Sequence, residues 1–293
     1  MKPKITGIMP VHNVISGHYP FLECILLALP LVDEMIIYDG GSNDGTIEVI
    51  KKLERADSRV KLVELKFNPS SDWVCIDENF EYCMNEIATG DWIIPLHADE
   101  YFHPDYYNQI LDAIYHYHNT NVNSIRHNMF YVSRWTKYED YNWLPVRIFR
   151  KQKGIKALDG IDSFKYEYGE YNPIKTGRFV RSDLYPEMKE EFVSYHINDI
   201  YEKGEFITDR RHVYFYGINS DKTRVDCYLG KKELYGIDKN DEDYDIEKIN
   251  FNPIVVDSFD HCIPEIFHGL MGKINYEVRE DLILNIEKYK KLK

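Results

Sequence analysis

Ile36-Ile-Tyr-Asp39-Gly40-Gly41-Ser42-Asn43-Asp44-Gly45-Thr46 decides the fold, together with a second stretch, Gly90-Asp-Trp-Ile-Ile-Pro-Leu-His97-Ala-Asp99-Glu100. In both stretches a short apolar run ends abruptly in acidic and small residues. This pattern is typical of a buried parallel strand that delivers carboxylates to its carboxyl edge. The carboxyl ends of parallel strands meet at one edge of an open α/β sheet, where ligands usually bind. The two stretches therefore predict an α/β fold with one ligand crevice between two acidic strand edges.

Strand and helix signals alternate on both sides of these stretches, which implies right-handed crossovers and a mainly parallel sheet. The predicted strands are Ile5–Val11, Glu34–Tyr38, Val60–Lys66 and Trp92–Leu96. The predicted helices are Pro20–Leu29, a helix from Asp44 or Thr46 to about Arg55, Asp77–Ala88 and Pro104–Tyr117. Later in the chain we expect strands at Ser124–Val132, Pro145–Arg150 and Phe192–Ile197, and a terminal helix over roughly Val278–Leu292.

The composition limits the classes of protein to which the chain can belong. Its 293 residues, 44% of them hydrophobic, suit one large α/β domain with an extension, or two small domains. The net charge of −13 argues against nucleic-acid binding, which depends on clustered Lys and Arg. Five cysteines without a Cys-x-x-Cys pair indicate a reduced, cytoplasmic protein. The longest apolar stretch, Phe21–Val32, is too short to span a bilayer, so we expect no transmembrane segment; a peripheral position at a membrane stays open.

Asp39 admits two interpretations at the end of its strand. Its carboxylate can accept a hydrogen bond from a nucleoside base, while the glycines after it let a ligand approach the backbone closely. Alternatively, Asp39 and Ser42 organise a tight turn and cap a helix. The second acidic strand edge favours ligand binding.

His97 and Asp99 follow the second apolar run. Alternation in an extended strand would place both side chains on one side, where both can approach one ion. Carboxylate oxygen suits Mg²⁺ or Mn²⁺, and an imidazole ligand makes Mn²⁺ the easier ion to accept. Such a cation would neutralise the diphosphate of a nucleotide donor. The alternative is a salt-bridged surface turn in which His97 is an ordinary polar residue.

Three ordered motifs resemble those of the inverting family 2 glycosyltransferases with the GT-A fold. Ile36–Thr46 looks like the family's DDGSxDGT signature, and Gly90–Glu100 is similar to the segment that contains its metal-binding DxD. Pro10-Val11-His12-Asn13 matches the family's PVxN element at the end of the first strand. The resemblance covers residues 4–110. It implies a Rossmann-like, mainly parallel sheet flanked by helices, a C-terminal acceptor-side extension, and a nucleoside-diphosphate-sugar donor.

The resemblance also implies roles for single residues. The donor-binding set would be Pro10, Val11, Asn13, Asp39, Gly41, Ser42 and Asp44. Asp99 would bind the metal, with His97 beside it as the second ligand inferred above, and His196 would complete the metal shell or contact a phosphate, unless it is a structural histidine. The sequence departs from the family pattern at Gly40, at His97, which replaces the first Asp of DxD, and at Glu81-Tyr82, which replaces an Arg-Asn pair.

An inverting transfer needs one carboxylate as a base near the acceptor hydroxyl. Arg147-Ile-Phe-Arg150 resembles the RLFR strand that precedes the acceptor region in some of these enzymes. In the stretch that follows, Asp162 is the first candidate for the base and Asp159 the second. A loop aspartate that caps a turn is the alternative for either residue.

These observations predict a metal-dependent glycosyltransferase of the hexosyl type. It would move a sugar from a nucleoside-diphosphate donor to the hydroxyl of a glycan, lipid-linked or other acceptor, in glycan or polysaccharide synthesis. Residues 1–120 would form the nucleotide-sugar-binding half, 121–200 the acceptor-side part of the same domain, and 201–293 a mainly helical extension. A non-catalytic nucleotide-sugar-binding protein of the same fold is the alternative.

Overall fold

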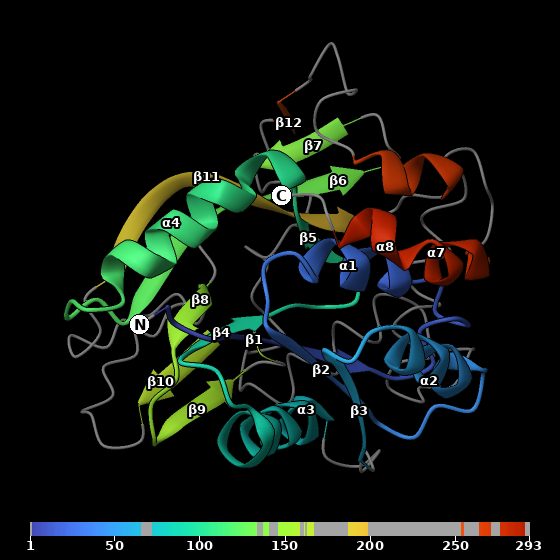
Figure 1. The fold of residues 1–293 in the computed structure, drawn as a ribbon, viewed down its shortest axis with the longest axis horizontal. Coiled ribbons are helices and arrows are strands. Elements are labelled where there is room, and N and C mark those ends of the chain that lie inside the picture. The colour runs from blue at the N-terminus through green and yellow to red at the C-terminus, as the bar shows by residue number, and fades with distance from the viewer. Residues whose placement is uncertain are drawn as a thin grey trace, which may run out of the picture.

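The computed structural model describes residues 2–65, 72–133, 137–140, 146–158, 161, 163–166, 187–198, 253–254, 264–270 and 276–290. Within this part of the chain, one sheet has ten strands and a second, separate sheet has two. Figure 1 shows the large sheet running through the molecule, with helices packed along it.

Four parallel strands form the centre of the fold. They are β1 (Ile5–Val11), β2 (Glu34–Asp39), β3 (Val60–Glu64) and β4 (Trp92–Pro95). β1 lies between β2 and β4, and β3 pairs with the other side of β2. The register places Val11 opposite Asp39 and Ile8 opposite Pro95. The strands β1, β2 and β4 therefore end at the same edge of the sheet, with β1 in the middle.

The remaining strands extend this sheet beyond β4 or form the separate hairpin. They are β5 (Glu100–Phe102), β6 (Ser124–Ser133), β7 (Lys137–Asp140), β8 (Val146–Arg150), β9 (Ile155–Leu158), β10 (Ser163–Tyr166), β11 (Glu187–Asn198) and β12 (Pro253–Ile254). β8 pairs antiparallel with both β4 and β6, and β7 and β12 continue the sheet from β6. β11 runs parallel to β6 and antiparallel to β5, whereas β9 and β10 form the hairpin.

Helices cover both faces of the sheet. They are α1 (Phe21–Ala28), α2 (Thr46–Ala56), α3 (Asp72–Tyr82) with its π-helical continuation η1 (Cys83–Ile87), the 3-10 helix η2 (Pro104–Tyr106), α4 (Tyr107–Tyr117), η5 (Glu265–Leu270), α7 (Glu280–Leu284) and α8 (Ile286–Tyr289). Apolar residues of α1, α2, α4 and the C-terminal helices share one hydrophobic cluster with the first face of the sheet. Apolar residues of α3, η1 and the β9–β10 hairpin share a second cluster with the other face.

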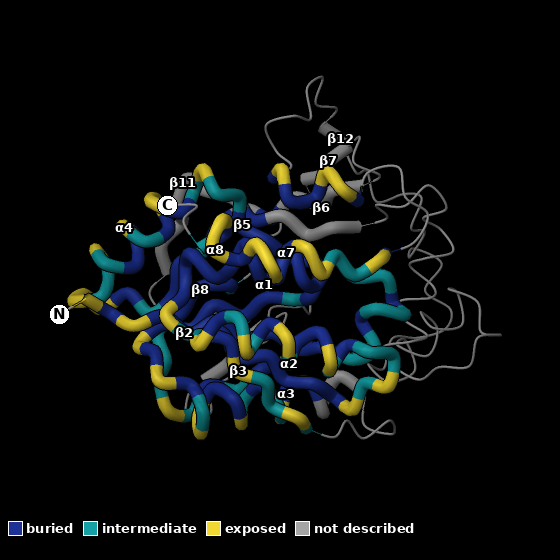
Figure 2. The backbone as a smooth tube through the Cα atoms, turned by 45° about the vertical axis from the view of Figure 1, so that its right-hand side comes forward, coloured by how far each residue is buried: buried dark blue, intermediate teal, exposed yellow. Residues whose placement is uncertain are grey.

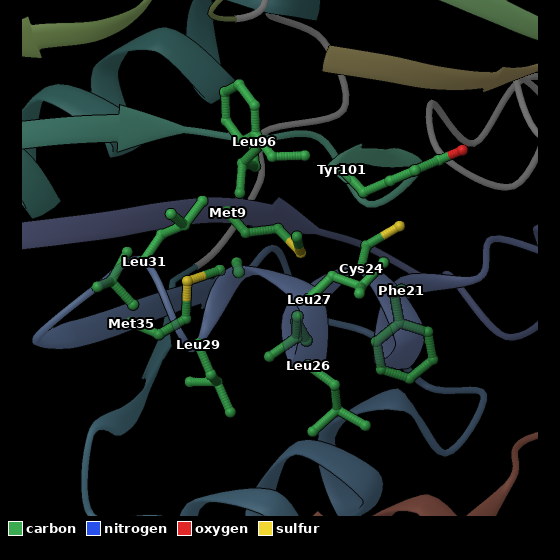
Figure 3. Packing of buried hydrophobic residues seen from close by; sticks show 14 of the residues in the cluster. Met9, Phe21, Cys24, Leu26, Leu27, Leu29, Leu31, Met35, Leu96 and Tyr101 are labelled. Carbon is green, nitrogen blue, oxygen red and sulfur yellow. The ribbon is translucent and has the colours of Figure 1, made fainter. Parts of the chain in front are cut away.

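Strand alternation explains why the sheet has two apolar faces. Successive residues of a strand point to opposite sides, so Met9 of β1 lies in the first cluster and Ile8 in the second. Figure 3 shows Cys24 and Leu27 of α1 packed in the first cluster with Met9. In Figure 2 the central strands are buried, and the exposed residues lie mostly on the outer sides of the helices and at loops.

The predicted α/β fold, with a mainly parallel sheet flanked by helices, is confirmed; the strands added beyond β4 are mixed in direction. β1 has the predicted bounds. The predicted terminal helix is interrupted at Asn285, so that α7 and α8 are two short helices. None of the described helices combines the length and the apolar character that crossing a lipid bilayer demands.

Candidate functional site at the carboxyl edge of the sheet

The carboxyl ends of β1, β2 and β4 bring three loops together. Pro10 and Val11 are buried at the end of β1 and lead into residues 12 and 13, the turn 40–45 follows β2, and residues 97–100 follow β4. Because β1 pairs with both β2 and β4, the two acidic edges lie on either side of the end of β1. The two stretches that predicted the fold therefore meet at one edge of the sheet.

Asp39 is fully buried, and its carboxylate organises the turn after β2. Its Oδ1 accepts hydrogen bonds from the backbone N–H groups of Gly41 and Ser42, each at 2.7 Å, and its Oδ2 accepts one from the Ser42 hydroxyl at 2.5 Å. Gly41 has a φ of +96°, which favours glycine, and a Cβ added there would meet nothing within 4 Å. The turn-forming interpretation of Asp39 is thus present, and the backbone at Gly41 faces open space. Contact between Asp39 and a nucleoside base stays a prediction.

The loop after β1 is tied to this turn. The Asn13 N–H donates to Ser42 Oγ at 2.7 Å, and Asn13 Oδ1 accepts from the Asn43 N–H at 2.8 Å. The Ser16 N–H donates to Asp44 Oδ2 at 2.7 Å. Asp44 Oδ1 accepts from the N–H and the hydroxyl of Thr46, the first residue of α2, but the N-cap position itself is Gly45, not Asp44 or Thr46 as predicted. The two loops form one hydrogen-bonded unit that contains the polar residues predicted to bind the donor.

Ser42→Ala tests how much this unit depends on one hydroxyl. The change leaves Asp39 Oδ2 without the donor at 2.5 Å and removes the acceptor of the Asn13 N–H. A buried carboxylate oxygen that loses its partner costs about 1–3 kcal/mol, so the free energy of unfolding should fall by that amount in urea titrations. The exposed Ser58→Ala is the matched control and should change it by less than about 0.5 kcal/mol. Equal stability of the two variants would contradict the role of Ser42.

After β4 the chain turns sharply instead of continuing as an extended strand. The Glu100 N–H donates to the His97 carbonyl at 3.1 Å, and Glu100 Oε2 accepts from the His97 N–H at 3.1 Å. His97 Nδ1 lies 3.3 Å from Glu100 Oε1. His97 and Asp99 therefore lie in a turn and not in the extended strand that the sequence analysis expected there, and their joint binding of a cation stays a prediction. The pairing of His97 with a carboxylate, which was its alternative role, is present.

Glu100 is held in turn by Arg147, and neither side chain is exposed to solvent. The guanidinium donates from Nε to Oε2 at 2.8 Å and from Nη2 to Oε1 at 2.7 Å, a bidentate pair. Burial by itself would raise the pKa of Glu100, but Arg147 and His97 hold that pKa well below its ordinary value, so the carboxylate is ionised. Both residues stand in motifs that the sequence analysis quoted, yet their partnership across the chain was missed.

Arg147 also helps to hold Ile161 in a strained conformation. Its Nη1 donates to the Ile161 carbonyl at 3.1 Å, and the Ile161 N–H donates to Asp77 Oδ1 of α3 at 2.8 Å. The φ of Ile161 is +68°, which costs about 1–2 kcal/mol for a β-branched residue. Glu81 of α3 accepts from the Ala157 N–H at 3.0 Å. Glu81, at the position of the family's arginine, therefore anchors the β9–β10 hairpin to α3.

The remaining predicted site residues lie near the same edge or outside the described part of the chain. His196 is in β11, and the register places it opposite Glu100 of β5. Asp159 and Asp162, the candidates for the base, lie outside the described residues. Over the described ranges, no group of three or more His, Cys, Asp or Glu side chains is arranged to hold a metal ion.

A family model agrees with the motifs. The family model for "Glycosyl transferase family 2" matches residues 6–167. The structure of S. aureus TarS 1-349 is similar at 15% identity over 79% of this chain and 78% of that chain, with a TM-score of 0.44. The mannosyltransferase PcManGT from Pyrobaculum calidifontis, in complex with GDP-Man and Mn²⁺, is similar at 14% identity over 80% of this chain and 70% of that chain, with a TM-score of 0.42. No curated protein matches the chain significantly. Because the family model covers more than half of its residues, the chain belongs to glycosyl transferase family 2.

Proposed function

We propose that this protein is an inverting glycosyltransferase of the hexosyl type. It moves a sugar from a nucleoside-diphosphate donor to an acceptor hydroxyl, and a divalent cation assists. One observation carries the proposal: the hydrogen-bonded unit built from Asn13, Asp39 and Ser42 lies beside the turn that bears Asp99, with only β1 between the strands that lead to them. A donor whose nucleoside binds to the hydrogen-bonded unit and whose diphosphate binds at the turn with Asp99 would span this edge of the sheet.

The nucleoside side of the proposed donor site is held together by internal hydrogen bonds and is partly exposed to solvent. The loop polar groups are already satisfied by one another, so little ordering is needed when a ligand binds. Gly41 and Asn43 are exposed, and Asn13, Ser42 and Asp44 are half-buried. These residues present backbone and side-chain polar groups to a base and a ribose.

The residues after β4 suit a divalent cation whose coordination shell would be completed by the phosphates of the donor. Mg²⁺ and Mn²⁺ are commonly bound through one or two protein ligands together with substrate phosphates. Asp99 would supply a hard carboxylate oxygen to such a cation. His97, whose Nδ1 faces Glu100, has the arrangement of a metal-ligating histidine oriented by a carboxylate behind it. A bound cation would stabilise the charge that develops on the departing diphosphate.

The chemistry requires a base on the acceptor side. A carboxylate, Asp162 or Asp159, takes the proton of the acceptor hydroxyl. The oxygen of that hydroxyl attacks the anomeric carbon at the same time. The bond from that carbon to the diphosphate oxygen breaks on the opposite face, so the configuration inverts. Binding of both substrates in this geometry converts the reaction into an effectively unimolecular step. The acceptor is a glycan, a lipid-linked compound or another compound with a free hydroxyl, and the reaction serves glycan or polysaccharide synthesis.

A panel of nucleoside diphosphates and their sugars, each with Mn²⁺, Mg²⁺ or EDTA, tests the proposal. A ligand that binds only the folded state at a hundred times its Kd contributes about 2.7 kcal/mol, so the matching nucleotide should raise Tm by about 5 °C in the presence of metal. NMR of the glycoside formed with that donor should show inversion at the anomeric carbon. If no nucleotide raises Tm, the proposal is wrong; binding without hydrolysis or transfer would instead support the non-catalytic alternative.

A further inference from the structure

The buried Arg147–Glu100 pair needs an explanation beyond stability. Removing two charges from water offsets most of the attraction between them, and apolar residues of similar volume often replace such pairs without loss. The pair nevertheless joins elements that do not pair directly, because β5 is bonded to β11 while β8 is bonded to β4 and β6. A role for the pair therefore lies in the other contacts that Glu100 and Arg147 make.

Each partner has a second contact outside the pair. Glu100 holds both the backbone N–H and Nδ1 of His97, at 3.1 and 3.3 Å. Arg147 holds the carbonyl of Ile161 at 3.1 Å, while Asp77 holds the N–H of the same residue at 2.8 Å. The ion pair is thus the connection between the turn after β4 and the turn of the β9–β10 hairpin.

The hydrogen bond from Arg147 helps to fix the backbone conformation of Ile161. A β-branched residue keeps a left-handed conformation only where its surroundings over-determine it, and here both of its backbone polar groups are bound. In the sequence, Ile161 directly precedes Asp162, the first candidate for the base. Arg147 therefore acts on the acceptor side of the proposed site, and Glu100 acts on its donor side.

We propose that Arg147 and Glu100 are positioning residues that fix the donor-side turn at His97 and the acceptor-side turn at Ile161 relative to each other. This inference rests on the proposed function. Small displacements of reacting groups cost large factors in rate, and groups that orient a metal ligand commonly affect activity or metal affinity 10- to 100-fold. Both residues would act without touching the reacting atoms.

The double variant Glu100→Leu with Arg147→Met is the test, because it removes both charges and keeps an apolar side chain at each position. Single changes leave an unpaired buried charge and can unfold the protein. The double variant should unfold within about 5 °C of the wild type. Its kcat should fall about 10- to 100-fold, and Mn²⁺ affinity in the presence of nucleotide, measured by electron paramagnetic resonance, should fall similarly. The KM for the donor should change less than about threefold, because the nucleoside side lies on β1 and β2.

Hydrogen exchange supplies a readout that does not depend on transfer. Amides of β5 and of the β9–β10 hairpin should exchange faster in the double variant, with little change in β1 and β2. The matched control is Asp57→Leu with Arg59→Met, which removes a pair whose Nη2–Oδ2 distance is also 2.7 Å, before β3 at the opposite edge of the sheet. This control should keep the wild-type kcat.

The activity and hydrogen-exchange measurements distinguish failure of this inference from failure of the proposed function. Faster exchange in both segments together with the loss of kcat supports the positioning role. A folded double variant with wild-type exchange, or with wild-type kcat and Mn²⁺ affinity, overturns it. A wild-type protein that transfers no sugar from any donor overturns the proposed function, and the exchange measurement alone then decides whether the pair fixes the two turns.

Discussion

Asp99→Ala is expected to abolish sugar transfer without unfolding the protein. Asp99 is the carboxylate that would hold the cation at the diphosphate, and only 5% of it is exposed. Removing a group that stabilises charge in the transition state typically lowers kcat by at least about 100-fold. The loss should appear with the donor identified by thermal stabilisation, at saturating Mn²⁺ and at saturating Mg²⁺.

The fold should tolerate this change because Asp99 lies in the turn between β4 and β5, outside the strands and helices. We expect Tm to change by no more than about 5 °C, as measured by calorimetry.

Asp112→Ala is the matched control for Asp99→Ala, because it removes the same group from an exposed position on α4. It should retain wild-type kcat and Tm. Full activity of Asp99→Ala with all metal chelated would sink the assignment of Asp99 as the metal ligand. Loss of activity in both variants would show that net charge, rather than the position after β4, controls the rate.

Local patterns were sufficient for the central strands. The run Ile5–Val11 alternates between two apolar clusters, and nothing distant in the chain is needed to recognise it as a buried strand. α3 begins at Asp72, five residues before the predicted start at Asp77. Ser70, Ser71 and Asp72 are residues that typically begin helices, and this signal was available in the sequence.

Contacts between distant residues were beyond the reach of such patterns. Glu100 and Arg147 are 47 residues apart, and only the folded sheet brings them within 2.7 Å. The three-residue strand β5 is too short to give a periodic signal, so the turn before it was treated as extended. Asp39 shows the same limit, because a carboxylate that caps its own turn and one that binds a base have identical sequence surroundings.

Glu23 is a further residue that no sequence pattern singled out. We expect its substitution to have the largest effect on the free energy of unfolding. It lies on α1 with none of its surface exposed, and its Oε2 accepts a hydrogen bond from the Tyr276 hydroxyl at 3.1 Å. Its Oε1 has no hydrogen-bond partner within the described part of the chain. Burial raises the pKa of Glu23 from 4.5 to about 7, although Tyr276 and Arg279 lower it and Asp281 raises it.

The raised pKa makes stability depend on pH in a defined window. Below pH 4.5 the carboxyl is protonated in both the folded and the unfolded states, so it has no effect. Above pH 4.5 the unfolded chain loses this proton while the folded protein keeps it, so stability falls as pH rises toward 7. Above pH 7 both states are ionised, and the full cost of the buried charge, about 3 kcal/mol, is reached.

Glu23→Gln should therefore stabilise the protein at alkaline pH only. The amide keeps the shape and an acceptor for Tyr276 but never ionises, so the free energy of unfolding should exceed that of the wild type by about 3 kcal/mol at pH 8. At pH 4.5 the two proteins should be equal, or the variant slightly weaker because its second amide N–H needs a partner. The exposed Glu78→Gln on α3 should show no such dependence. A pH-independent difference between Glu23→Gln and the wild type, in urea titrations from pH 4.5 to 8.5, would mean that Glu23 is ionised in the folded protein throughout this range.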